Sequence, residues 1–407
     1  MNFVHTADVH LGCVQYGLME RFRDYARAFK QIVDYTLSVK ADFMLISGDL
    51  FHHRSINSPT YVQIYRLLSP LRDAEIPVLA IEGNHDLAFE KDKYSWLSAL
   101  EAQGLLTLLN PTEQGMLAHR VIEADETVRV FGTRWLGSSI TRSIPQIAQE
   151  IASEKGADYT VLMMHCGLEG ASVKANGEVS MTAVMQLKGM VDYLALGHYH
   201  IPFERDGWIY NPGSPEMVSL GDITDVRGFY HTTDKGTSFV PISTRPLFEV
   251  SVNSKGLSSP EQLYDKVRES TLERVKRAEP NEKPIVVLNI EGALEFSHSA
   301  LSTPRLIEAA ESACDALVVR PRFRLPRERE LPVRGAQQML RLEEVERDVL
   351  KSIVGADGRY KGIEKELLEA IVEVKRYAAS GETEKAHALI SELFTAFWRQ
   401  KGADKGT

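Results

Sequence analysis

The chain has 407 residues, of which 43% are hydrophobic and 25% are charged, a composition typical of a soluble globular protein with two or three domains. The sequence holds no apolar run of the roughly 18 residues that a membrane-spanning helix needs, and its start, MNFVHTADVH, does not have the pattern of a signal peptide. The net charge of −9 does not favour a polyanion partner overall, so any nucleic-acid site must be local.

Residues 1–245 alternate short apolar strands with helical patterns. MNFV begins a strand, residues 22–39 place apolar side chains at helical spacing, and ADFMLISGDL is a buried strand. A helix from about Thr60 to Asp73 leads into the strand of IPVLAIEGNHD, and YTVLMMHCG and VDYLALGHYH are two further apolar runs that end on glycine or polar groups. This alternation predicts an α/β sandwich with its functional groups at strand ends.

Residues 246–326 have a different pattern, which predicts a small β-α-β-α-β module. Strands at PLFEVSVN, KPIVVLNIEG and ALVVRPRFRL are separated by helices predicted at Ser259–Ala278 and Thr303–Ala313. The stretch LPRERELPVRG combines helix breakers with many charges, so we interpret residues 327–335 as a linker.

Residues 336–407 are almost entirely helix-forming. From Ala386 onward, apolar residues recur at the spacing of one helix face, and this stripe ends in three large aromatics, Phe394, Phe397 and Trp398. The stripe could pack on a hairpin partner helix, but the three aromatics offer more surface than two helices easily cover. We therefore expect them to bind a partner protein.

Polar residues follow each buried strand of the first region. Seven of them are candidate metal ligands: Asp8, His10, Asp49, Asn84, His165, His198 and His200. Residues i and i+2 of an extended chain point the same way, so each D-x-H or H-x-H pair is expected to reach one ion. Imidazole and carboxylate ligands suit manganese, iron or zinc better than magnesium or calcium. Seven ligands exceed the need of one ion but suit two ions that share a carboxylate, an arrangement that cleaves phosphoesters.

The order D-x-H, G-D, G-N-H-D, a lone histidine and G-H-x-H resembles the calcineurin-like metallophosphoesterases. HTADVHLG, ISGDLFH, IPVLAIEGNHD and LGHYH followed by YNPGSPE are similar to the motifs of SbcD-type double-strand-break repair nucleases and their archaeal and eukaryotic counterparts. The motifs cover residues 1–245, and beyond them only the order of a capping module and a helical tail is similar. The resemblance implies a calcineurin-like β-sandwich flanked by helices, in a homodimeric nuclease that works with an SMC-like ATPase of the SbcC type.

The resemblance also implies a role for each site residue. The first ion would be bound by Asp8, His10 and His200, the second by Asn84, His165 and His198, and Asp49 would bridge them. Among catalytic residues, His85 would face the scissile phosphate, Asp86 would orient that imidazole, and His52 would line the substrate path. Two divalent ions per chain, most often Mn²⁺, are implied as cofactors.

Three functions remain open from the sequence. The leading one is a manganese-dependent DNA nuclease with 3′ to 5′ exonuclease and single-strand endonuclease activity, the catalytic subunit of an ATPase–nuclease repair complex. The second is a phosphodiesterase or phosphatase that acts on a small nucleotide or a phosphoprotein, and the third is a clamp subunit that mainly binds the ATPase. The three cysteines, Cys13, Cys166 and Cys314, lack metal-finger spacing and indicate a reducing compartment, so we expect a cytoplasmic, nucleoid-associated protein without a membrane segment.

Overall fold

The computed structural model describes residues 1–111, 115–171, 177–224, 226–278, 280–297 and 300–324, and in the C-terminal part residues 350, 351, 354, 364–379, 382 and 384–391. Its contacts separate two compact units, Met1–Arg324 and Leu325–Thr407. None of the helices in the described ranges is both long enough and apolar enough to cross a bilayer.

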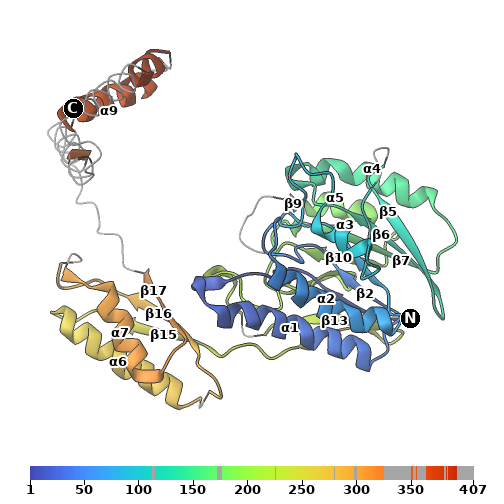
Figure 1. Ribbon diagram of the computed structural model, residues 1–407, viewed down its shortest axis with the longest axis horizontal. Coiled ribbons are helices and arrows are strands. Elements are labelled where there is room, and N and C mark those ends of the chain that lie inside the picture. Colours follow the sequence, from blue (N-terminus) through green and yellow to red (C-terminus); the bar gives the residue numbers. More distant parts are fainter. Residues whose placement is uncertain are drawn as a thin grey trace. The chain divides into compact units, whose positions relative to one another are not determined.

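Two six-stranded sheets form the body of the first unit (Figure 1). The strand order of the first sheet is β14 (Gly236–Pro241), β13 (Gly228–Thr233), β1 (Asn2–Thr6), β2 (Phe43–Ile46), β3 (Val78–Ala80), β4 (Thr107–Leu108). That of the second sheet is β11 (Phe203–Arg205), β12 (Ile209–Asn211), β10 (Tyr193–Gly197), β7 (Tyr159–His165), β6 (Thr127–Thr133), β5 (Ala118–Glu123). The strands β1 to β4 are mutually parallel, as are β6, β7, β10 and β12. A separate pair, β8 (Gly167–Leu168) and β9 (Glu178–Val179), lies outside both sheets.

The core lies between the two sheets and under the helices that cover them. Alternate residues of β1 and β2, such as Phe3 and Phe43, pack against Met163 and Tyr193 of the second sheet. The other faces of the strands pack against helices: α1 (Met19–Ser38), α2 (Ser58–Asp73) and α3 (Trp96–Glu101) on the first sheet, and α4 (Ile140–Ser153) and α5 (Met181–Val184) on the second. Because both faces are buried, the strands read as continuous apolar runs. The predicted α/β sandwich is confirmed.

Residues 247–324 form a third, three-stranded sheet. The strands β15 (Leu247–Asn253), β16 (Ile285–Glu291) and β17 (Val318–Arg324) are parallel, and α6 (Pro260–Lys276) and α7 (Thr303–Cys314) cover one of its faces (Figure 1). The element order is the β-α-β-α-β order expected from the sequence. The domain boundaries at residues 245 and 326 stay predictions.

The second unit contains α9 (Glu364–Ala379) and a helical segment at residues 384–391. Leu368, Ala370 and Ala386 are buried within the described part of the chain. The predicted partner-binding residues Phe394, Phe397 and Trp398 lie outside the described residues, so their role stays a prediction.

His5 lies inside β1 and is fully buried. Its Nδ1 is 3.0 Å from the Tyr193 hydroxyl and its Nε2 is 2.9 Å from Ser47 Oγ. Burial lowers the pKa of His5 to about 3, so the imidazole is neutral in the folded protein at neutral pH. We interpret it as a structural histidine rather than a ligand.

The burial of His5 predicts acid sensitivity. The unfolded chain binds a proton near the ordinary histidine pKa of about 6.5, whereas folded His5 binds one only near pH 3, so this contribution to stability is complete above pH 6.5 and is lost as the pH falls toward 3. The slope reaches about 1.4 kcal/mol per pH unit. In metal-free protein, His5→Gln should make the melting temperature less dependent on pH between 6 and 4, whereas His119→Gln, at an exposed position, should leave that dependence as in the wild type. Equal slopes for His5→Gln and wild type would contradict this assignment.

Candidate metal centre

The candidate ligands lie directly after parallel strands whose carboxyl ends meet at one edge of the sandwich. Asp8 and His10 follow β1, Asp49 follows β2, and Asn84 follows β3. In the second sheet, His165 ends β7, and His198 and His200 follow β10. The first two loops are joined by main-chain hydrogen bonds, from Asp8 N–H to the Gly48 carbonyl and from His10 N–H to the Asp49 carbonyl, each 3.0 Å.

Four of these residues have left-handed backbone conformations. The φ angles are 53° for Asp8, 50° for His10, 52° for Asp49 and 81° for His198. A residue with a Cβ pays about 1–2 kcal/mol for this conformation, so surrounding contacts must enforce it. The expectation that each pair converges because it lies on an extended strand is therefore wrong. The side chains converge because the chain turns sharply after each strand.

Hydrogen bonds between loops hold these turns in place. The Asp8 carboxylate accepts two bonds from the His198 N–H, at 2.9 and 3.1 Å. Asp49 Oδ1 accepts one from the His85 N–H at 2.9 Å. Each carboxylate thus joins the end of one strand to the loop after another strand, and keeps a second oxygen or lone pair for other partners.

Two glycines allow the loops to approach closely. A Cβ on Gly83 would collide with Asp49 Oδ1, and a Cβ on Gly48, whose φ is +88°, would collide with the His165 imidazole. These are the glycines of the G-N-H-D and G-D motifs, and no larger residue fits at either position without moving a candidate ligand. The motifs therefore contain glycine for packing next to the site.

The donor atoms form two groups. In the first, His10 Nε2 and His200 Nε2 are 3.2 Å apart, and Asp8 Oδ1 is 4.0 Å from His200 Nε2. In the second, Asn84 Oδ1 is 3.2 Å from both His165 Nε2 and His198 Nδ1.

Asp49 lies between the two groups. Its Oδ2 is 3.3 Å from His165 Nε2 on one side and 3.9 Å from His10 Nε2 on the other. The structure thus brings together all seven candidate ligands, with one carboxylate in the central position.

These spacings and donor types fit divalent metal ions. Two ligand atoms roughly 2.1 Å from a tetrahedral or octahedral ion stand about 3.0–3.4 Å apart, close to the 3.2–3.3 Å separations observed here. The carboxylate and imidazole atoms of Asp8, His10 and His200, and those of Asp8, Asp49 and His165, lie within 4.8 Å of one another. Imidazole, carboxylate and amide donors together suit first-row divalent ions.

Three imidazoles are oriented through their Nδ1 atoms. His165 Nδ1–H donates to the Ser47 carbonyl at 2.7 Å, and His85 Nδ1–H donates to the His52 carbonyl at the same distance. His200 Nδ1–H donates to Asp222 Oδ2 at 2.8 Å. Each bond fixes the proton on Nδ1 and leaves Nε2 available to a metal ion or a substrate.

The charges of the centre are strongly coupled because it is buried. Burial raises the pKa of Asp8 to about 6. Burial alone would lower the pKa of His165, but Asp49 and Asp8 raise it to about 9. Burial alone would also raise the pKa of Asp49, yet His165 holds it below its usual range. In the metal-free protein, the proton on His165 therefore offsets the negative charge of the neighbouring Asp49 and Asp8 carboxylates.

Asp86 makes other contacts than the expected one, whereas His52 lies beside the candidate ligands. The buried Asp86 carboxylate accepts bonds from the main-chain N–H groups of Leu50, Phe51 and Gly83 at 3.0–3.2 Å, and so ties the loops after β2 and β3 together. The expected orienting contact from Asp86 to the His85 imidazole is replaced by the His52 carbonyl. The His52 ring is also stacked on the His85 ring, with centroids 5.6 Å apart, which places it beside the candidate ligands.

Asp222 is a residue of the centre that the sequence analysis missed. It ends the short helix η4 (Leu220–Asp222) in a capping box with Ser219, whose N–H donates to Asp222 Oδ2 at 2.8 Å. Burial alone would raise the pKa of Asp222, but the bond to His200 lowers it. The available signal was the S-x-x-D pattern of Ser219 to Asp222, which marks a helix start.

Asp222 predicts a measurable effect on metal affinity. Asp222→Asn should weaken Mn²⁺ binding by about 10–100-fold, because a neutral amide fixes and polarises the His200 imidazole less well than a carboxylate. Isothermal titration calorimetry would measure the change, with Asp125→Asn, at a fully exposed position, as the matched control. Unchanged affinity in Asp222→Asn would show that the bond to His200 has no positioning role.

Comparison with known proteins agrees with this geometry. Residues 1–202 match the model of the calcineurin-like phosphoesterase family. Among curated relatives, three proteins named "DNA double-strand break repair protein Mre11" are similar. The one from Archaeoglobus fulgidus is 30% identical over 65% of this chain and 64% of its own length, and the one from Haloferax volcanii is 30% identical over 78% and 66%. The one from Aeropyrum pernix is 42% identical over 49% of each chain.

The chain thus spans about half to two thirds of the length of these relatives. The match to the family model covers β1 to β10, the strands whose carboxyl ends bear all seven candidate ligands. The resemblance inferred from D-x-H, G-D, G-N-H-D and G-H-x-H is confirmed. Residues 1–202 therefore form a calcineurin-like phosphoesterase domain.

Proposed function

We propose that the chain is a manganese-dependent DNA nuclease that acts in double-strand-break repair. The proposed activities are 3′ to 5′ exonuclease on double strands and endonuclease on single strands. The observation that carries the proposal is the arrangement of the six other candidate ligands around Asp49, whose Oδ2 is 3.3 Å from His165 Nε2 and 3.9 Å from His10 Nε2. The relatives named as double-strand-break repair proteins support DNA as the substrate.

Each half of the centre would hold one ion. Asp8, His10 and His200 would bind the first, Asn84, His165 and His198 the second, and Asp49 both. Two such ions would neutralise the oxygens of a phosphodiester and lower the pKa of a water molecule between them. Imidazole ligands favour manganese over magnesium at such a centre.

The chain's own groups would orient the substrate and assist the leaving group. The His52 carbonyl holds His85 Nδ1–H at 2.7 Å, so His85 Nε2 is the free nitrogen of that ring. In the imidazolium form of His85, Nε2–H would donate its proton to the oxygen that leaves the phosphorus, in line with the attacking oxygen, and the ring would then be neutral with its remaining proton on Nδ1. His52, stacked beside it, would line the path of the strand.

The test is the release of acid-soluble nucleotides from end-labelled linear duplex DNA. Release with Mn²⁺, loss with EDTA, and products that shorten from the 3′ end are expected. Bis(p-nitrophenyl) phosphate serves as a small phosphodiester in parallel. Hydrolysis of this ester without any attack on duplex or single-stranded DNA would favour the small-molecule phosphodiesterase instead. The absence of both activities in metal-loaded protein would favour a clamp subunit.

We further propose that the chain is a homodimer in the cytoplasm, associated with the nucleoid, and that it binds an SMC-like ATPase of the SbcC type. For the dimer, α2 offers partly exposed apolar side chains, with Val62 at 43% and Tyr65 at 38% exposure. For the ATPase, Phe394, Phe397 and Trp398 would contribute to one face of the helical tail. Truncated aromatics at a buried interface cost on the order of 2 kcal/mol or more each.

Deleting residues 330–407 should separate catalysis from assembly. The first unit, Met1–Arg324, contains the whole candidate centre, so Mn²⁺-dependent cleavage of short DNA should persist while co-purification with the ATPase is lost. Replacing Phe394, Phe397 and Trp398 together by alanine should weaken the same interaction at full length. A truncated protein with a lower melting temperature and weaker cleavage, but unchanged ATPase binding, would indicate that the tail packs on the catalytic unit.

A further inference from the structure

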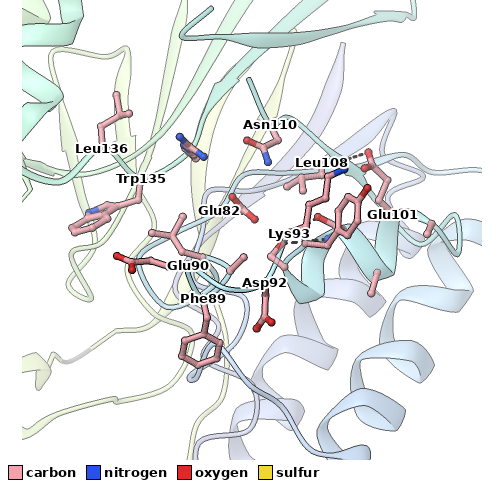
Figure 2. Close-up of a pocket in the computed structure, with 18 residues that line it drawn as sticks. Glu82, Phe89, Glu90, Asp92, Lys93, Glu101, Leu108, Asn110, Trp135 and Leu136 are labelled. Carbon is pink, nitrogen blue, oxygen red and sulfur yellow. Dashed lines mark hydrogen bonds between the residues drawn. The ribbon is translucent and has the colours of Figure 1, made fainter. Parts of the chain in front are cut away.

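A large cavity borders the candidate metal centre. Its volume is about 1020 Å³, at the upper end of the roughly 300–1,000 Å³ typical of small-ligand sites. It is formed by the segment after β3, by α3 and by the segment after β6 (Figure 2). Glu82 lies two residues before Asn84, and the main-chain N–H of Trp135 donates to the main-chain carbonyl of Glu82 at 2.8 Å, so the lining of the cavity starts two residues from a candidate ligand.

Trp135 links the cavity to the centre. The Nε1 atom of its indole and the Nε2 atom of His198 both lie within 4 Å of the point that a Cβ on Gly177 would occupy. Trp135 Nε1 is buried and has no hydrogen-bond partner among the described residues. The indole forms one wall of the cavity in Figure 2, opposite α3. A flat apolar surface therefore stands beside a proposed metal ligand.

The chemistry of the cavity does not suit a phosphate. Its charged lining is four carboxylates against two cations: Glu82, Glu90, Asp92 and Glu101 against Lys93 and Arg134. Like charges repel at these distances, so the cavity disfavours anions. Glu82 projects into the middle of the view in Figure 2, and only 5% of the residue is exposed. Burial raises its pKa, although Ser95 and Arg134 act in the opposite direction.

An aromatic wall and a buried hydrogen-bond acceptor are what an unstacked nucleobase needs. Bases stack on aromatic side chains without sequence preference, and a carboxylate accepts hydrogen bonds from exocyclic amino groups. Phe89 and Tyr94, exposed by 42% and 69%, add aromatic surface to the same lining. The acidic lining would exclude the phosphate of the same nucleotide from the cavity. That phosphate would instead bind at the neighbouring metal centre.

We propose that this cavity receives an unstacked base of the DNA strand whose phosphate lies at the metal centre, stacked on Trp135 and bonded to Glu82 through an exocyclic amino group. This inference rests on the proposed nuclease function and specifies which part of the DNA substrate binds in the cavity. A basic side chain of a partner protein would also suit the carboxylates, but the indole wall and the position of Glu82, two residues from Asn84, favour a base.

The cleavage pattern of single-stranded DNA tests the proposal. Oligonucleotides of one sequence carry a single abasic residue that is moved one position at a time, and the cut phosphates are mapped with Mn²⁺. We expect cutting to fall about tenfold at one phosphate with a fixed offset from the abasic residue. In Trp135→Ala this local gap in cutting should disappear, because the abasic residue no longer has an effect. Trp135→Phe should restore the gap in part. Phe323→Ala, an aromatic on β17 outside the cavity, should keep the gap.

Binding without cleavage separates this inference from the nuclease function. In EDTA, the ratio of affinities for an intact strand and a base-free strand of equal length should fall about tenfold in Trp135→Ala, with melting temperatures as the control for folding. Cleavage that ignores the abasic residue, or an affinity ratio that Trp135→Ala leaves unchanged, would overturn the base site and leave the nuclease. Base-dependent binding without cleavage would support the site and overturn the nuclease. Binding to neither strand would overturn both and favour the basic partner side chain.

Discussion

His85→Ala should lower the rate of DNA cleavage by about 10²–10⁴-fold while both proposed metal ions stay bound. Its imidazole is held through Nδ1 by the His52 carbonyl at 2.7 Å, which leaves Nε2 to act on the leaving oxygen. The seven candidate ligands, Asp49 included, complete the two groups without His85. Steady-state kinetics on short DNA, together with elemental analysis of bound metal, would measure both effects.

The metal count decides between two roles for His85. Ring nitrogens of His10, His52 and His85 also lie within 4.8 Å of one another, a spacing that could hold an ion. Loss of about half of the bound metal in His85→Ala would make His85 a ligand and contradict its assignment as an acid. His53→Ala, at the exposed neighbour of His52, is the matched control and should change neither rate nor metal content.

The sequence predicted candidate ligands that the fold does bring together, but not how the chain positions them. Buried strands followed by polar groups identified Asp8, Asp49 and His198, because the hydrophobic pattern of a doubly covered strand is a local property. Their left-handed φ angles of 52–81° are not local, since Asp and His rarely adopt them unaided. The conformation depends on bonds such as that from the His198 N–H to Asp8, across 190 residues of sequence.

The supporting contacts were harder to predict for the same reason. Asp86 was expected to orient its neighbour His85, but it bonds instead to main-chain groups of a different loop, at Leu50 and Phe51. Asp222 lies 22 residues after His200 and carries no metal-site motif of its own, so only the fold shows that they meet. Sequence spacing identifies candidate ligands that follow strands. The residues that hydrogen-bond to those ligands or to their loops depend on which loops are neighbours in the fold.

Asp49→Asn should weaken the binding of both ions. The loss of affinity should exceed the tenfold to hundredfold loss expected for Asp222→Asn, and it should also exceed the loss in His10→Ala. Asp49 Oδ2 is the donor between the two groups, and a shared carboxylate offsets the repulsion between two cations. An amide nitrogen in that place could not ligate. Calorimetry with Mn²⁺ would measure both affinities, and unchanged values would contradict the bridging assignment.

The same substitution has a readout that needs no metal. Asp49 is the main group that raises the pKa of His165 to about 9, against a burial effect that lowers it. Without that carboxylate charge the burial effect dominates, so His165 should lose its proton at a lower pH in metal-free Asp49→Asn than in the wild type. Histidine NMR titration would detect the change, and the same titration of His10→Ala, which keeps the carboxylate, should retain a high pKa for His165. In the metal-free wild type, His165 carries a proton that a metal ion must displace. Metal affinity should therefore fall as the pH is lowered.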